Sequence, residues 1–354
     1  MPTEPTPPWR LTTAKPDEAD RAAWTRRLPT AAAMRAGGAP TLEPASAPDP
    51  ADPANYLADE ALIDAINTAL LLGQPLLITG EPGCGKTEAA NFLAYRLGLE
   101  RPSPQDGVEY ALRFDTKSTT TARDLFYGFD VVSRFYAAQN GGDPAPEKHI
   151  TLNALGRAIA AASDNPIAAR LRLDASPAEP SRSVVLIDEV DKAPRDVPND
   201  LLVELERLQF YIAEMDVTIS ARRDLQPIVV LTSNSERVLP DAFLRRCVFL
   251  SLPFPRDDLL VDIVMARVAA YKRSRPAAMR LVTMFTKLRN SRLSRRPGTA
   301  ELLSFAHILA DLGAPDPADL KGERNWHQAA RVTLLKNVED QARADARLLN
   351  GLLA

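Results

Sequence analysis

The residues best suited to chemistry stand in one run of eight, Gly80-Glu81-Pro82-Gly83-Cys84-Gly85-Lys86-Thr87. An apolar run, residues 76–78, precedes it and an amphipathic segment, residues 88–97, follows it, which predicts a strand, a glycine-rich turn and a helix. Such a turn exposes backbone N–H groups beside a helix N-terminus, and these groups bind a phosphate chain. We therefore expect Lys86 to reach the β- and γ-phosphates of a nucleotide and the Thr87 hydroxyl to ligate Mg²⁺. The flanking strand and helix argue against the alternative, a chance match in a glycine-rich loop.

A second short apolar run, residues 183–187, ends in Asp188 and Glu189. An uninterrupted apolar run is typical of a parallel strand that is buried on both faces. Carboxylates at the end of such a strand face the phosphate loop of a neighbouring strand, so we expect Asp188 to hold Mg²⁺ through water and Glu189 to act as general base. The alternative is a strand that simply enters a solvated turn.

A third apolar run, residues 227–232, is followed by Ser233, Asn234 and Ser235. The planar amide of Asn234 carries a donor and an acceptor, so it can hydrogen-bond both a γ-phosphate oxygen and the attacking water. An asparagine at a strand end is also an ordinary turn former. The two preceding motifs favour the first interpretation.

Composition sets limits on the class of protein. With 354 residues, 45% of them apolar and 25% charged, the chain is long enough for one large or two small globular domains. A net charge of −3 argues against a dedicated nucleic-acid binder, which would carry a basic face. Cys84 and Cys247 have no metal-ligand spacing and suit a reducing compartment. No apolar run approaches the roughly 18 residues of a membrane span, so we expect no membrane contact and a cytoplasmic location.

The N-terminal stretch, residues 1–53, is rich in proline and alanine and predicts a mostly unstructured leader. A short helix over residues 20–28 is an alternative, because Trp24 is unusual in a disordered segment. From Asn55 apolar residues recur at helical spacing and stop at Gly73, which predicts a helix before the glycine-rich turn. The turn that opens this helix carries Tyr56 and Leu57, which are candidates to sandwich an adenine or to pack in the core.

Further elements follow from the same patterns. A strand is expected over residues 108–114, and a hydroxyl-rich turn, residues 115–121, then caps a helix that contains residues 124–127. Another helix is expected over residues 156–163. Beyond the Asp-Glu strand we expect a helix over residues 199–210, a hairpin over residues 210–219, and helices over residues 259–271, 277–288, 301–312 and 326–349.

In this order and spacing, the segments 80–87, 184–189, 232–234 and Leu239-Pro240-Asp241-Ala242-Phe243-Leu244-Arg245-Arg246 resemble the AAA+ ATPases, and most closely their MoxR branch. The likeness runs from about Asn55 to the C-terminus. It implies that Lys86 and Thr87 are the Walker A pair, that Asp188 and Glu189 are the Walker B pair, and that Asn234 is sensor 1. It also implies that Arg246 is an arginine finger that acts on the nucleotide of a neighbouring subunit.

Two positions depart from this simple transfer. Arg245 is adjacent to Arg246 and either shares its role or belongs to a solvated face or an intersubunit ion pair. Sensor 2 falls on residues where relatives carry an arginine and this chain does not, so we assign it to Arg296, with Arg295 second, as a displaced equivalent.

The resemblance implies a fold and an organisation. The expected fold class is α/β, a P-loop AAA+ doubly wound parallel sheet core with a small all-α C-terminal lid domain. The expected domains are the leader, residues 1–53; the nucleotide-binding domain, residues 54–252; and the lid, residues 253–354.

The resemblance also implies a function. We expect an ATP- and Mg²⁺-dependent homo-hexameric ring that remodels, activates or assembles a separate client, or a partner with a von Willebrand factor A domain. One alternative is an ATP-gated scaffold or signalling switch with little turnover. Another is a nucleic-acid motor, which is disfavoured because aromatic and basic residues do not interleave.

Overall fold

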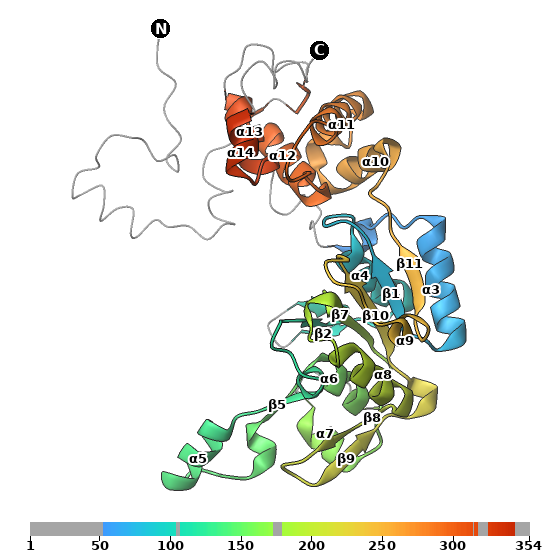
Figure 1. Cartoon of the computed structure of the whole chain (residues 1–354), viewed down its shortest axis with the longest axis vertical. Coiled ribbons are helices and arrows are strands. Elements are labelled where there is room, and N and C mark those ends of the chain that lie inside the picture. The colour runs from blue at the N-terminus through green and yellow to red at the C-terminus, as the bar shows by residue number, and fades with distance from the viewer. Residues whose placement is uncertain (1–51, 104–106, 173–178, 314, 318–324, 344–354) are drawn as a thin grey trace, which may run out of the picture. The chain divides into compact units, whose positions relative to one another are not determined.

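The computed structural model describes residues 52–103, 107–172, 179–313, 315–317 and 325–343 (Figure 1). They divide into two compact units. One unit is residues 56–254, and the other combines residues 52–55 with the described residues from Pro255 onward. The predicted leader, including its alternative helix at residues 20–28, lies outside the described residues except for Asp52 and Pro53.

A five-stranded sheet forms the centre of the first unit. Its strands are β1 (Leu76–Thr79), β4 (Leu112–Asp115), β7 (Val184–Asp188), β10 (Ile228–Ser233) and β11 (Val248–Ser251). They lie in the order β11-β1-β10-β7-β4, and every neighbouring pair is parallel. Thr79 lies opposite Ser233, and Asp115 lies opposite Asp188. The carboxyl ends of the strands therefore meet at one edge of the sheet, where open parallel sheets bind ligands.

Helices cover both faces of this sheet (Figure 1). On one face, α3 (Glu60–Leu72) and α4 (Lys86–Leu97) pack on a core that includes Leu76 and Ile78. On the other face, α6 (Ala154–Ala161) and α8 (Val197–Arg207) pack on a core that includes Leu77. Successive strand residues thus enter opposite cores, as their period of two requires. The predicted fold class, a doubly wound parallel sheet, is confirmed.

The helix before β1 shows how local sequence sets the boundaries. The Asp59 carboxylate accepts a hydrogen bond from the Leu62 N–H at 2.8 Å and caps the first turn of α3. Gly73 ends the helix with a φ of 63°, a left-handed conformation that favours glycine. The chain then turns directly into β1.

Two of the predicted elements of this unit are wrong, and the helix expected over residues 326–349 is interrupted between Leu334 and Val338. The strand expected over residues 108–114 is two strands, because β3 (Val108–Glu109) pairs with β2 (Arg101–Pro102) and only β4 joins the sheet. The helix expected at residues 124–127 is one 3-10 turn, η2 (Arg123–Leu125), followed by the strand β5 (Tyr127–Phe129). Tertiary contacts override the helical pattern here: Tyr127 is buried, pairs with Leu152 and donates its hydroxyl to Glu214 at 2.9 Å.

The remaining elements of this unit connect the sheet strands. They are α5 (Val131–Gln139), η3 (Pro146–His149), β6 (Ile150–Leu152), α7 (Pro166–Leu171), η4 (Val190–Lys192), β8 (Gln209–Ile212), β9 (Val217–Ser220), η5 (Arg223–Leu225) and α9 (Asp241–Leu244). The strands β8 and β9 pair antiparallel, which confirms the predicted hairpin.

The second unit is helical in its described part. Its elements are η1 (Pro53–Asn55), α10 (Asp257–Arg267), η6 (Ala269–Tyr271), α11 (Arg275–Arg289), α12 (Thr299–Asp311), α13 (Asn325–Leu334) and α14 (Val338–Arg343). Phe285, Phe305 and Trp326 are fully buried in it. In the described part of the chain, every helix is too short or too polar to cross a membrane.

Candidate nucleotide site

The turn between β1 and α4 has a backbone that depends on glycine. Gly83 and Gly85 have φ angles of 79° and 96°, in the left-handed region. At Gly80 a Cβ atom would lie 2.3 Å from the Leu252 carbonyl oxygen. The Lys86 ammonium donates to the carbonyl oxygens of Gly80 at 2.8 Å and Glu81 at 3.0 Å. The lysine side chain is therefore folded inside the loop, at the start of α4, where an incoming phosphate would meet it.

Asp188 ends β7 and is buried among hydrogen-bond donors. The Thr87 hydroxyl lies 3.2 Å from each of its carboxylate oxygens. The Thr232 hydroxyl of β10 donates to Oδ1, and Arg113 Nη2 of β4 donates to Oδ2 at 2.9 Å. Two hydroxyls and one guanidinium thus hold a carboxylate at the carboxyl edge of three neighbouring strands.

Glu189 follows immediately, with a φ of 56° that turns the chain out of β7. Its backbone N–H donates to the Thr232 hydroxyl at 2.9 Å. Its carboxylate accepts from Asn234 Nδ2 at 2.9 Å and from the Lys192 ammonium. The hydrogen bond to Glu189 raises the pKa of Lys192 above its ordinary value, so the lysine stays charged beside the carboxylate.

Asp191 supports the loop that carries Asn234. It is buried, and its carboxylate accepts from the backbone N–H groups of Asn234 at 3.4 Å and Glu236 at 2.9 Å. The amide of Asn234 is thereby held over Glu189.

The structure brings together five residues predicted from the sequence: Lys86, Thr87, Asp188, Glu189 and Asn234. Sequence reasoning missed Arg113, Lys192 and Thr232 as parts of the site. Lys192 stands three residues after Glu189, a spacing that brings two side chains together on a helical turn. The sequence around Arg113 carries no such spacing, because the contact of Arg113 with Asp188 depends on the pairing of β4 with β7.

Residues 75–258, just over half of the chain, match the family described as AAA domain, dynein-related subfamily. The chain belongs to this AAA family. The predicted AAA+ ATPase resemblance is confirmed at the level of the family, whereas the MoxR branch stays a prediction.

No curated protein matches the sequence. Among solved structures, NtrX from Brucella abortus in complex with ADP matches with a TM-score of 0.42 and 15% sequence identity. The match covers 82% of this chain and 61% of the NtrX chain.

Next to the glycine-rich loop of the AAA domain lies the ring of Tyr56. Its centroid is 5.2 Å from the Phe92 ring of α4, and a Cβ atom at Gly85 would meet it at 3.3 Å. Leu57, the other predicted adenine contact, is 37% exposed. Cys84 is buried under the loop, and burial raises the pKa of its thiol, so it is a packing residue there.

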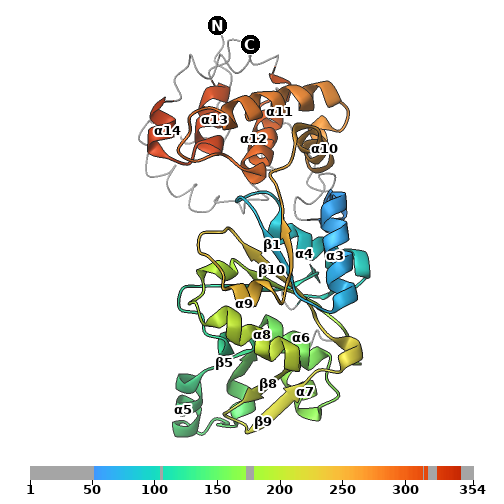
Figure 2. The same ribbon diagram turned by 45° about the vertical axis from the view of Figure 1, so that its right-hand side comes forward.

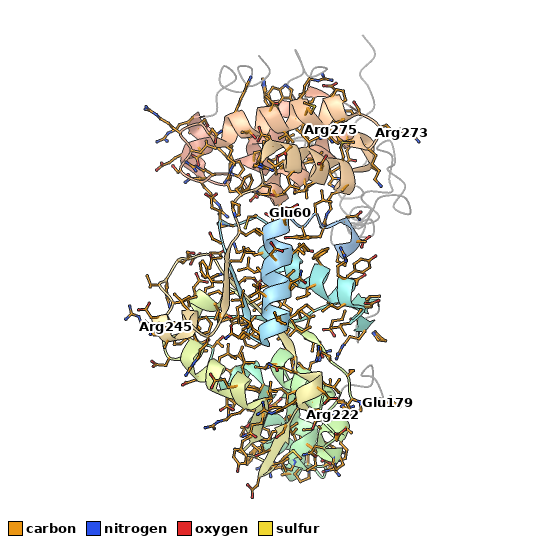
Figure 3. All side chains as sticks on the ribbon, turned by 90° about the vertical axis from the view of Figure 1, so that its right-hand side faces the viewer. Glu60, Glu179, Arg222, Arg245, Arg273 and Arg275 are labelled. Carbon is orange, nitrogen blue, oxygen red and sulfur yellow. The ribbon has the colours of Figure 1, made fainter. Side chains whose placement is uncertain are left out.

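The two predicted finger residues lie at the opposite edge of the sheet. The Val248 N–H donates to the Pro75 carbonyl at 2.9 Å, so the chain passes the amino end of β1 just after Arg246. Arg246 forms an ion pair with Glu206, with 3.3 Å between Nε and Oε1, and lines a pocket of about 360 Å³. Arg245 is exposed and points away from the ribbon in Figure 3. The AAA domain therefore does not bring its own arginine pair to its own Lys86.

The predicted sensor 2 residues belong to the helical unit. The backbone N–H groups of Ser294 and Arg295 donate to the Asp340 carboxylate at 2.8 and 3.0 Å, which fixes the segment before Arg296 and α12. The assignment of sensor 2 to Arg296 or Arg295 stays a prediction.

Proposed function

We propose that this chain is a MoxR-type AAA+ ATPase that couples ATP binding and hydrolysis to remodelling, activation or assembly of a separate partner protein. The observation that carries the proposal is a hydrogen-bonded chain at the carboxyl edge of β1, β10 and β7. Its members are Thr87, Asp188, Thr232, Glu189 and Asn234. Lys86 stands on the same edge, and this set of groups suits phosphoryl transfer to water.

The residues present fit a magnesium ion. The Thr87 hydroxyl and both Asp188 oxygens are hard oxygen ligands, and they lie 3.2 Å apart. We propose that Thr87 holds Mg²⁺ directly and that Asp188 holds it through water. When bound, the ion would polarise phosphoryl oxygens and offset the charge that develops on them. The backbone of residues 80–87 and the Lys86 ammonium would bind the phosphates themselves.

In this mechanism Glu189 is the general base that takes a proton from the attacking water. Asn234 Nδ2, at 2.9 Å from Oε1, fixes the orientation of the carboxylate, and the other end of the amide can hold the water or a γ-phosphate oxygen. Lys192 occupies the second oxygen of Glu189. When the attacking water binds, either Lys192 must leave this oxygen or the water must share the oxygen with Lys192.

The adenine is proposed to lie beside Tyr56 and Leu57. The support is that the Tyr56 ring lies directly beside the glycine-rich loop, where a Cβ atom at Gly85 would meet it at 3.3 Å.

Arg246, with Arg245 beside it, is proposed to act in a neighbouring subunit. The support is geometric, because the pair precedes the amino end of β11 while the phosphate loop follows the carboxyl end of β1. A parallel strand of four residues is about 13 Å long, so one chain cannot present both ends to one phosphate. An arginine supplied in trans requires an assembly, and we propose a homo-hexameric ring. The Arg246–Glu206 pair would open when the neighbour binds.

We further propose that residues 54–252 form the nucleotide-binding domain and residues 253–354 a lid, with Arg296, or Arg295 second, as a displaced sensor 2. The support is the pair of hydrogen bonds that the backbone N–H groups of residues 294–295 donate to the Asp340 carboxylate, which orders this backbone. A fixed backbone would let the following arginine face an anion at the start of α12.

Three variants test the enzymatic proposal: Glu189→Gln, Arg246→Ala and, as a matched surface arginine, Arg222→Ala, which pairs with the exposed Asp224. We expect Glu189→Gln to bind ATP as the wild type does and to hydrolyse it at least about 100-fold more slowly. Arg246→Ala should bind ATP and lose a comparable factor, because arginine fingers contribute about 10³-fold or more. Arg222→Ala should keep full activity. Full activity in both site variants would disprove the mechanism.

The partner is proposed to be a separate protein, a client or a protein with a von Willebrand factor A domain, in the cytoplasm. Glu189→Gln, loaded with ATP, should retain the partner on purification from cells, whereas Lys86→Ala should not, because it cannot hold the triphosphate.

An ATP-gated scaffold with little turnover is a second candidate. One observation favours it: Glu189 is engaged by both Lys192 and Asn234, which leaves a general base little freedom to accept a proton. Turnover that stays slow with every partner, together with ATP-dependent assembly, would select this candidate.

A further inference from the structure

An insertion between η2 and α6 carries an exposed apolar helix. It consists of β5, α5, η3 and β6, and α5 stands at its end, away from the central sheet, in Figures 1 and 2. The exposed fractions are 63% for Val131, 78% for Val132, 63% for Phe135 and 69% for Tyr136. At 100° per residue these four side chains lie within an arc of about 140°, so they form one continuous face of the helix. We call this set the α5 face.

Polar contacts hold the other side of α5 in place. The Asp130 carboxylate caps the helix through the Ser133 N–H at 2.8 Å. Arg134 Nε donates to the Pro144 carbonyl at 3.0 Å. The Ser133 hydroxyl lies 3.1 Å from His149 Nδ1, and His149 Nε2 lies 3.0 Å from the Asp143 carbonyl oxygen. These contacts turn the α5 face outward and prevent it from folding back on its own insertion.

The base of the insertion is anchored in the core of the same unit. The Phe126 ring stacks on Phe210 with centroids 5.4 Å apart. Tyr127 is buried, and its hydroxyl donates to Glu214. A Cβ atom at Gly156 would lie 1.9 Å from the Phe126 carbonyl oxygen. Only glycine therefore allows α6 to approach the backbone just before β5 this closely. The α5 face is therefore presented by a well-packed support.

The size of the α5 face limits what can bind it. Two aromatic rings and two valines at these exposures offer about 400–500 Å² of apolar surface, which is within the range of functional patches on single proteins. A lasting dimer needs about 800 Å² from each partner. The face thus suits an occupant that binds weakly and leaves, such as a short segment of another polypeptide.

The charges around the α5 face exclude a membrane surface as its main occupant. Helices that bind anionic lipid carry several lysines and arginines beside their apolar face. The one basic residue on α5 is Arg134, which is tied to the Pro144 carbonyl. The insertion also carries Asp130, Asp143 and Glu147, and its one lysine, Lys148, is paired with Asp143. The four side chains of the face are uncharged, so the face is complementary to an apolar occupant and not to a highly charged one.

We propose that the α5 face is a docking site for an extended apolar segment of an incompletely folded client polypeptide. The proposal rests on the remodelling function proposed above and names the class of client. Several copies of the face in one assembly would raise the overall affinity without any new contact. Because the occupant is apolar, its binding should be insensitive to salt up to physiological ionic strength.

The test uses the full chain and fluorescein-labelled, reduced and carboxymethylated α-lactalbumin, a permanently unfolded polypeptide, with anisotropy as the readout. We expect Val132→Asp combined with Phe135→Asp to weaken binding at least about tenfold. The milder pair Val131→Ser and Tyr136→Ser should weaken it in the same direction. The matched control is Val338→Asp, an 85% exposed valine at the start of α14, which should bind within about twofold of the wild type.

Several outcomes would overturn the proposal. These are failure of the wild type to bind the unfolded probe, equal binding of native α-lactalbumin, unchanged binding by both α5 variants, or preferential binding to phosphatidylserine vesicles. A change in oligomeric state of the α5 variants by sedimentation would instead make the face a contact between copies. The ATPase rate separates the docking proposal from the enzymatic one. The α5 variants should keep the wild-type basal ATPase rate. If the wild type binds the probe through the α5 face but hydrolyses no ATP, the docking proposal stands and the enzymatic proposal is wrong.

Discussion

Arg113 on β4 donates from Nη2 to Asp188 Oδ2 on β7 at 2.9 Å. The same nitrogen lies 2.7 Å from Asp115, so one guanidinium bridges two carboxylates at the carboxyl edge of the sheet. Asp188 is the residue that we propose to hold Mg²⁺, and a guanidinium and a metal ion cannot use the same oxygen at full strength. The contact makes Arg113 a competitor of the metal.

Arg113→Gln should strengthen divalent metal binding. Partly exposed ion pairs contribute at most about 1 kcal/mol, so the dissociation constant of Mn²⁺, measured by electron paramagnetic resonance with saturating ADP, should fall by up to about fivefold. The control is Arg222→Gln, which removes an exposed arginine from an unrelated pair and should leave the constant unchanged. Weaker Mn²⁺ binding in Arg113→Gln would mean that Arg113 supports the metal site.

Gly156→Ala should destabilise the protein. A Cβ atom there would collide with the Phe126 carbonyl oxygen, and overpacking against backbone costs about 1–3 kcal/mol. Gly128→Ala is the matched control, because nothing lies within 4 Å of its Cβ position. Urea unfolding followed by circular dichroism should show the loss in the first variant only, and equal midpoints would show that α6 can move away from β5.

Both thiols should react slowly with iodoacetamide in the native protein. Burial raises the pKa of Cys84 above 9.0 and that of Cys247 to about 12, and only the thiolate reacts. At pH 8.5 we expect modification at least about tenfold faster in guanidinium chloride than without it. Above about pH 9 the thiols ionise in the unfolded chain but stay protonated in the folded one. The free energy of unfolding should therefore fall as the pH rises beyond that value. Fast labelling of the native chain would contradict this account.

Asp340→Asn should lower the Tm at pH 7. Hydrogen bonds from the backbone N–H groups of Ser294 and Arg295 hold the pKa of Asp340 below its ordinary 3.8. Such a carboxylate contributes stability above the unfolded pKa and loses it as the pH falls through the folded pKa, so the difference from the wild type should shrink below about pH 4. Asp258→Asn, at an exposed pair with Arg256, is the control and should change little. A difference that persists at low pH would point to packing instead.

The parts of the site that the sequence predicted are those in which each motif lies within one continuous segment of the chain. The glycine-rich turn of residues 80–87, with a strand before it and a helix after it, can be read locally, and so can an apolar strand that ends in Asp188 and Glu189. The fold class follows, because such strands alternate with helices.

The parts that the sequence did not predict depend on contacts between distant segments. Arg113 meets Asp188 only because β4 pairs with β7 in one register, and register cannot be read from either strand alone. The helix expected at residues 124–127 is wrong because the burial of Tyr127 against distant residues overrides local propensity. The helix α5 was missed although its apolar residues recur at helical spacing, and their exposure could not be read from that spacing.

The sheet order has a consequence for biosynthesis. The phosphate loop follows β1, and the two acidic residues lie at the carboxyl end of β7, yet these strands do not pair with each other, because β10 lies between them. A nascent chain that has emerged only through Glu189 lacks the strand that must lie between the two halves. The pocket for the triphosphate can therefore close only after residue 233 has left the ribosome, and until then the edges of β1 and β7 that pair with β10 are open.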